Sequence, residues 1–158
     1  MPFSRSLVPV SPRRVNLNPA SNLQTSISRI LVVDDYEPWR RLVCSLLQKE
    51  SDLKVVGEAR DGLEAVQKAI DLRADLVLMD IDLSKMNGLE AARRIGDAAQ
   101  GARILFVSQI NDTDVIEAAL DNGASGYILK MDAEAELLPA IKAIVRGARL
   151  VPTSRVTD

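Results

Sequence analysis

The sequence predicts an α/β protein with one parallel sheet covered by helices on both faces. Five short, β-rich apolar runs alternate with segments in which apolar residues return at helical spacing. The runs are almost continuously apolar, which is typical of strands whose two faces are both buried. Because a helical segment follows each run, right-handed βαβ units and parallel strand pairing are expected.

Each predicted element has a local signal in the sequence. Pro38 marks the first turn of the first helix, where proline is tolerated. Asp61 and Glu64 form the start of the second helix as a capping box in which Asp replaces Ser or Thr. The helix after the fourth strand is expected to end at 122–123, and Asp132 is the expected cap of the last helix. The strands are predicted at residues 30–33, 53–56, 76–79, 104–107 and 127–129.

The 158 residues correspond to a single domain with two flanking segments. Residues 1–28 contain four prolines, six serines and no acidic residue, so we expect a disordered N-terminal tail. An organelle transit peptide is the alternative, which the prolines oppose. The domain is expected over 29–147. Residues 148–158 are predicted to be a C-terminal tail or a truncated linker.

Composition excludes several classes of function. Hydrophobic residues make up 47% and charged residues 27%, the balance of an ordinary globular domain. No run of 18 apolar residues occurs, so no membrane helix is expected and a cytoplasmic location is predicted. Cys44 is the single cysteine and histidine is absent, which excludes Ser-His-Asp catalysis and zinc cages of Cys and His. Chemistry must therefore rest on carboxylates, hydroxyls, lysine and arginine.

Polar residues follow four of the five predicted strands. In an open parallel sheet, ligands bind beyond the carboxyl ends of the strands, so these residues are candidates for one site. Each alone has an ordinary explanation, such as a helix cap, a turn or a solvated charge. Their coincidence at one edge is what points to a function. The residues are Asp34 and Asp35 after the first strand, Asp80 and Asp82 after the third, Ser108 after the fourth and Lys130 after the fifth.

This set predicts a phosphoryl-transfer site. Carboxylates that converge at one edge repel each other, and a proton or a cation must relieve that repulsion. An all-oxygen ligand set favours a hard ion, most simply Mg²⁺. Lys130 and Ser108 are suited to phosphate oxygens, and Asp80 is placed to attack phosphorus and form an acyl phosphate.

Over roughly residues 29–147, the sequence resembles the receiver domain of two-component response regulators. The resemblance implies a flavodoxin-like (βα)5 fold, doubly wound, with strand order 2-1-3-4-5. The last matching stretch is most similar to receivers of regulators with a helix-turn-helix output domain. The resemblance is carried by residues 32–35, 78–80, 86–91, 107–108 and 124–130.

The resemblance also implies a phosphorelay function. According to this resemblance, Asp80 accepts a phosphoryl group from a phosphohistidine in a reaction that needs Mg²⁺. The phosphohistidine would belong to a sensor histidine kinase or a phosphotransfer protein. The ion would be held by Asp34 or Asp35, by Asp80 and by the main-chain carbonyl of Asp82. Asp80 is thus the expected phosphorylation site.

Further roles follow from the same resemblance. Lys130 and Ser108 would hold phosphoryl oxygens, and Ser108 and Tyr127 would form the switch that changes a protein-interaction surface. The chain would be a phosphoacceptor in signalling rather than a turnover enzyme, with a homodimer as a candidate assembly. No membrane association is expected, and no direct nucleic-acid contact by this chain.

Three residues depart from the family pattern, and two alternatives remain open. Ser84 replaces a usual proline, while Gln109 and Asp82 are expected to alter the phosphate lifetime by shielding or repelling water. The chain could be the receiver part of a truncated DNA-binding transcriptional regulator. A haloacid-dehalogenase-like phosphatase would use Asp80 and Asp82, but in that family the acidic pair comes last along the chain, whereas 34–35 comes first here.

Overall fold

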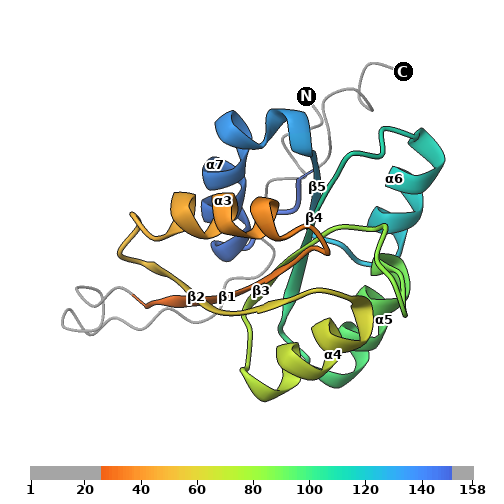
Figure 1. Cartoon of the computed structure of the whole chain (residues 1–158), viewed down its shortest axis with the longest axis horizontal. Coiled ribbons are helices and arrows are strands. Elements are labelled where there is room, and N and C mark those ends of the chain that lie inside the picture. The colour runs from red at the N-terminus through yellow and green to blue at the C-terminus, as the bar shows by residue number, and fades with distance from the viewer. Residues whose placement is uncertain (1–25, 151–158) are drawn as a thin grey trace.

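The protein is built around a five-stranded parallel sheet (Figure 1). A computed structural model describes residues 26–150. The strand order β2-β1-β3-β4-β5 confirms the predicted fold class and the order 2-1-3-4-5. The strands are β1 (Ser28–Val33), β2 (Leu53–Ala59), β3 (Leu76–Met79), β4 (Arg103–Ser108) and β5 (Gly126–Leu129).

Helices cover both faces of this sheet. One apolar cluster joins α3 and α7 to one face, and a second joins α4, α5 and α6 to the other, as Figure 1 shows. Neighbouring residues of β1, such as Leu31 and Val32, point into different clusters, which explains why the strands are apolar throughout. The helices are α3 (Glu37–Leu47), α4 (Gly62–Asp71), α5 (Gly88–Ala98), α6 (Thr113–Asp121) and α7 (Ala133–Val145), with a short 3₁₀ turn, η1 (Lys130–Asp132).

The predicted helix ends differ from the structure in two details. The Asp61 carboxylate accepts a hydrogen bond from the Glu64 amide, as expected, but the Glu64 carboxylate reaches back to the amide of Arg60, one residue before the cap. Asp132 stands at the N-cap position of α7, as predicted, but its side chain makes no capping hydrogen bond. The backbone of Asp132 belongs to the η1 turn, with φ −101° and ψ 2°, and is not extended as at a usual N-cap.

The chain remains attached to the domain after α7. The amide of Leu150 donates to the carbonyl of Ser125 at 2.7 Å, and the Arg149 guanidinium donates to the carbonyl of Ala124 at 3.1 Å. The predictions made for residues 1–25 and 151–158 fall outside the described residues. Between residues 26 and 150, no helix is long and apolar enough to cross a membrane.

The loop from β3 to α5 passes very close to the end of β3. The amide of Gly88 donates to the carbonyl of Ile81 at 2.7 Å, and a Cβ atom at residue 88 would fall well inside van der Waals contact of the main-chain oxygen of Asp80. The absence of a side chain at this position therefore lets the loop fold back beneath Asp80.

We expect Gly88→Ala to destabilise the protein, because neither backbone segment can move away without breaking its hydrogen bonds. Gly96→Ala is the matched control on the same helix, since a Cβ there meets nothing within 4 Å. That change should stabilise folding by about 0.5–1 kcal/mol through helix propensity. Urea unfolding of both variants checks the prediction, and equal effects at the two positions would contradict it.

Candidate functional site

The carboxyl ends of the strands open onto a cavity of about 430 Å³. The structure brings five of the sequence-predicted residues to its wall, together with Gln109. Asp34 lies below the wall with only 1% of its surface exposed, and Tyr127 lies behind it at 3%. The lining residues are Asp35, Tyr36, Asp80, Asp82, Ser108, Gln109, Ile110 and Lys130.

The ammonium group of Lys130 lies between two carboxylates. Its Nζ is 2.7 Å from Oδ2 of Asp34 and 3.3 Å from Oδ2 of Asp80. Burial lowers the pKa of Lys130, but the two carboxylates more than offset this and leave the pKa above its usual value. Lys130 is thus the charged group that relieves the repulsion expected from the sequence.

Asp34 is fixed in place from several sides. Its Oδ1 accepts a hydrogen bond from the amide of Tyr36 at 2.9 Å, and its own amide donates to the carbonyl of Ala59 at 3.0 Å. Burial raises the pKa of Asp34, and the contacts with Lys130 and the Tyr36 amide only partly counteract it. The Lys130 charge thus lowers the free-energy cost of keeping the Asp34 carboxylate ionised.

Asp80 is presented at the mouth of the cavity in a defined orientation. Its Oδ1 accepts a hydrogen bond from the amide of Ile81 at 2.7 Å and is 3.4 Å from the amide of Asp82. The opposite oxygen faces Lys130. The residue is 8% exposed, so the carboxylate is largely buried and can still be reached from the cavity.

Ser108 and Tyr127 are linked through the loop that follows β4. The hydroxyl of Ser108 accepts a hydrogen bond from the amide of Ile110 at 3.1 Å, and the Tyr127 hydroxyl donates to the carbonyl of the same residue at 2.7 Å. Burial raises the pKa of Tyr127. The ring of Tyr127 packs at 6.3 Å from that of Phe106, so the tyrosine is turned inward.

The donor set fits Mg²⁺, although not as a preformed cage. Across residues 26–150, no three acidic or cysteine side chains are grouped closely enough to hold a metal ion by themselves. Mg²⁺ keeps several waters and needs only one or two carboxylates. Asp35 and Asp80 both line the cavity, and Oδ2 of Asp34 is buried without a hydrogen-bond partner beyond its ion pair. These oxygens leave room for a hydrated ion.

Two neighbouring residues on the first turn of α3 also border the site, and sequence reasoning missed the second of them, Arg40. The Lys130 Nζ lies 5.1 Å from the centroid of the Trp39 ring, within the range of a cation–π contact. Arg40 is buried and donates to the main-chain oxygen of Asp34 at 2.7 Å. Their proximity to the acidic pair in the sequence was the only signal, and it does not distinguish packing residues from site residues.

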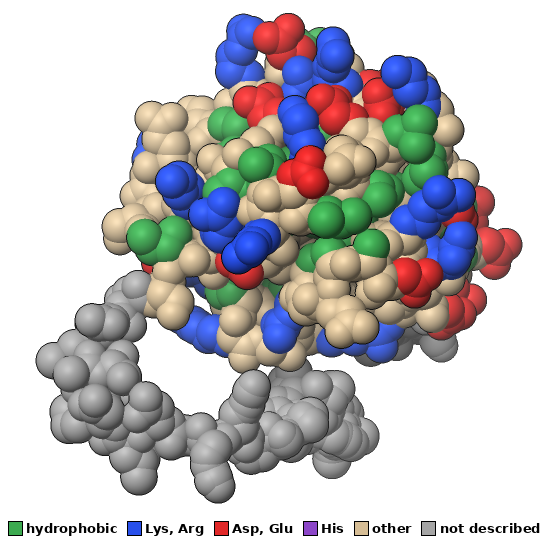
Figure 2. Space-filling view, turned by 90° about the horizontal axis from the view of Figure 1, so that it is seen from below, with side chains coloured by type: hydrophobic (Ala, Val, Ile, Leu, Met, Phe, Trp, Pro, Cys, Tyr) green, Lys and Arg blue, Asp and Glu red, His purple; other side chains and the backbone are tan. Residues whose placement is uncertain are grey.

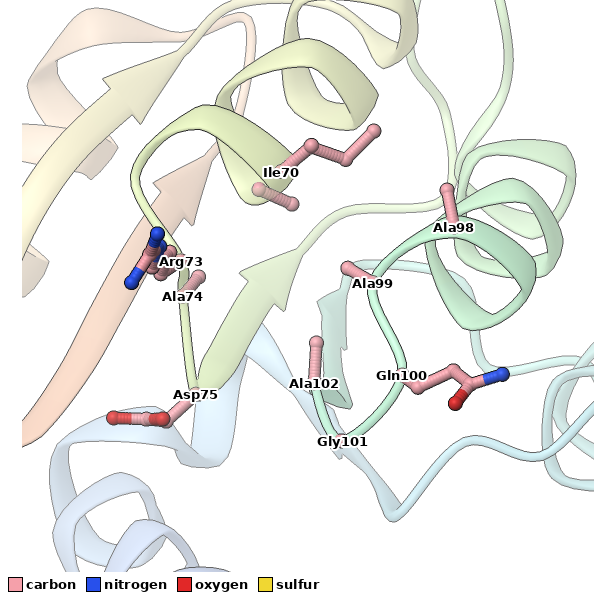
Figure 3. A pocket seen from close by; sticks show the side chains of 10 residues that line it. Ile70, Arg73, Ala74, Asp75, Ala98, Ala99, Gln100, Gly101 and Ala102 are labelled. Carbon is pink, nitrogen blue, oxygen red and sulfur yellow. The ribbon is translucent and has the colours of Figure 1, made fainter.

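A further cavity of about 420 Å³ lies at the opposite ends of the strands, between the ends of α4 and α5. Alanines and the chain around Gly101 form most of its wall (Figure 3). In Figure 3, Arg73 and Asp75 point to one side of the cavity and Gln100 points to the other. This cavity therefore lacks converging reactive groups, and the strand-end site is the better candidate.

A family model described as a response regulator receiver domain matches residues 30–142. The chain belongs to the response regulator receiver family. Its likeness to solved receivers agrees with this. A two-component response regulator of the LuxR family from Aurantimonas sp. SI85-9A1 superimposes with a TM-score of 0.77 at 34% identity, covering 84% of this chain and 94% of that chain. The response regulator domain of Thermotoga maritima CheB gives 0.68 at 34% identity, covering 75% and 97%.

Curated relatives of this receiver are longer proteins. It is 34% identical to the transcriptional regulatory protein LiaR of Bacillus subtilis (strain 168), over 75% of this chain and 56% of LiaR. It is 35% identical to the response regulator protein VraR of Staphylococcus aureus (strain NCTC 8325 / PS 47), over 75% of this chain and 57% of VraR. The chain thus spans little more than half the length of these relatives.

We expect Lys130→Gln to destabilise the receiver by about 3 kcal/mol at neutral pH, because it leaves the buried Asp34 carboxylate unpaired. Without the ammonium, the pKa of Asp34 rises further above its usual value. The variant is then closest to the parent in stability below that pKa, where Asp34 is protonated. It loses stability relative to the parent as the pH rises through that pKa. Urea unfolding at neutral pH and at about pH 5 should therefore show the deficit shrinking in acid.

Asp34→Asn supplies the control for this experiment. In the Lys130→Gln background it removes the unpaired charge, so the double variant should recover much of the lost stability. If Lys130→Gln is as stable as the parent at neutral pH, or if Asp34→Asn gives no recovery, the ion pair is not the main support of the site.

Proposed function

We propose that Asp80 is the phosphoacceptor of this receiver and that a phosphohistidine on a sensor histidine kinase or phosphotransfer protein is the donor. The observation that supports this is the Lys130 ammonium held between Asp34 and Asp80 at a cavity that Ser108 also lines. Such an arrangement offers a nucleophilic oxygen next to a fixed cation and a hydroxyl, which are the groups a phosphoryl group requires.

In the proposed reaction, an oxygen of the Asp80 carboxylate forms a bond to phosphorus. The bond between phosphorus and the donor's imidazole nitrogen breaks, and its electron pair returns to that nitrogen, which takes up a proton. Lys130 is already within 3.3 Å of Asp80 and offsets the charge on the phosphoryl oxygens. Catalysis therefore consists of positioning and charge compensation by groups that are in place beforehand.

The residues that would hold Mg²⁺ are Asp34 or Asp35, Asp80 and the main-chain carbonyl of Asp82. Asp35 is the more accessible member of the first pair, because Asp34 is buried and engaged with Lys130. When bound, the ion supplies additional positive charge toward the phosphoryl oxygens.

Phosphorylation then acts as a switch. A phosphoryl group adds about −1.5 to −2 units of charge at Asp80 and draws the Ser108 hydroxyl toward it. Because the Ile110 amide and carbonyl are bonded to Ser108 and Tyr127, the loop after β4 follows. The surface of α6, β5 and α7 changes as a shift of population between two states.

We further propose that the chain signals from the cytoplasm as a phosphoacceptor rather than a turnover enzyme, through a partner or a homodimer. Relatives named transcriptional regulators suggest that the whole protein controls transcription. In this proposal the receiver itself does not contact DNA, and any such contact is made outside it. On the side of α4 and α5, Figure 2 shows basic and acidic side chains intermixed, which does not favour a nucleic-acid surface.

Intact mass measurement tests the phosphoacceptor. With a small acyl phosphate donor, the parent should gain one phosphoryl group only when Mg²⁺ is present, and Asp80→Asn should gain none. Asp82→Asn is the matched control from the same acidic group and should still gain one phosphoryl group, because only the main-chain carbonyl of Asp82 is proposed to hold the ion. Repeated turnover of a phosphomonoester would instead support a phosphatase and contradict the proposal.

Gln109 and Asp82 line the cavity and are exposed, so both are placed to act on a water molecule that approaches the phosphoryl group. We expect Gln109→Ala and Asp82→Asn to shorten the phosphate lifetime, since they remove a shield and a repelling charge. Loss of the phosphoryl group, followed by mass over time, measures this. Rates equal to that of the parent would remove both residues from the account.

A further inference from the structure

We propose that Arg40 is a positioning residue that sets the affinity of the site for Mg²⁺ by fixing the peptide bond between Asp34 and Asp35. This inference rests on the proposed function. Arg40 is a buried cation that contacts the acidic pair, Asp34 and Asp35, through a main-chain oxygen and not through a carboxylate.

Arg40 joins three elements at the edge of the site. Its side chain extends from α3, and the residue is 8% exposed. Nη1 donates to the main-chain oxygen of Asp34 at 2.7 Å, just beyond the end of β1. Nε donates to Oε1 of Glu58 in β2 at 2.9 Å. A guanidinium is suited to this task because its planar fork holds two acceptors in fixed directions.

The positive charge of Arg40 is neutralised outside the proposed metal site. Glu58 neutralises Arg40, while the carboxylate of Asp34 turns to Lys130 instead. Arg40 therefore orders the acidic turn without competing with a metal ion for carboxylate oxygens.

Asp35 is the residue that depends on this arrangement. Its carboxylate is exposed at the cavity and makes no hydrogen bond or ion pair with any other described residue. The backbone alone therefore sets the position of the Cα–Cβ bond from which this carboxylate reaches into the cavity. Because a peptide bond is planar, a fixed Asp34 carbonyl also fixes the amide nitrogen of Asp35. The carbonyl is bonded to Arg40 and the amide of Asp34 to Ala59, so the turn is held from both sides.

The test is a Mg²⁺ titration of the full chain, followed by Trp39 emission and by calorimetry, with urea unfolding in parallel. Arg40→Met should weaken Mg²⁺ binding about 10-fold or more, the range seen when an outer-shell partner is removed. Arg40→Lys should restore part of the affinity, because an ammonium can still reach the carbonyl. Arg41→Met is the matched control, since Arg41 is exposed and, among residues 26–150, forms an ion pair with Glu37 alone, and it should bind Mg²⁺ like the parent.

Glu58→Ala separates positioning from simple attachment of α3 to β2. It removes the Nε contact but keeps the bond from Nη1 to the Asp34 carbonyl, so it should reduce stability more than Mg²⁺ affinity. Arg40→Met with parental Mg²⁺ affinity, or Glu58→Ala with an equally large loss of affinity, would overturn the inference. A parent chain that binds no Mg²⁺ would instead contradict the proposed function itself.

Discussion

The site depends on one ion-pair arrangement, the Lys130 ammonium held between the carboxylates of Asp34 and Asp80. Two acids so close would otherwise repel each other, and burial would drive Asp34 toward its neutral form. The lysine opposes this shift at Asp34 and holds its ammonium 3.3 Å from the Asp80 carboxylate. In the proposed reaction the same ammonium would also contact the incoming phosphoryl group, so that one side chain would serve both stability and chemistry.

The architecture delivers these groups by simple means. Parallel strands end at one edge, so residues far apart in sequence meet there without long loops. Gly88 lets the loop after β3 pass beneath Asp80, and Arg40 holds the turn after β1. The loop after β4 connects Ser108 to the inward-turned Tyr127. Each support acts through main-chain atoms, which leaves the reactive side chains free to change partners.

Much of the fold could be predicted because periodicity and strand ends are local properties of the sequence. Continuous apolar runs gave the strands, and the residues just after them gave the site, including Asp80 and Lys130. The missed features depend on tertiary contacts. Nothing in the sequence indicates that Trp39 lies over Lys130 or that Arg40 is buried. Asp132 does not cap α7 through its side chain, because its backbone lies in the 3₁₀ turn η1 and not in the extended conformation of a usual N-cap.

The most direct measurement is the location of the phosphoryl group in the parent chain. Hydroxylamine attacks the acyl carbon of an aspartyl phosphate, releases phosphate and leaves a stable hydroxamate that peptide mass spectrometry can locate. After treatment with an acyl phosphate donor and Mg²⁺, the hydroxamate should be found at Asp80 alone. A hydroxamate at Asp34, Asp35 or Asp82, or none at all, would contradict the account.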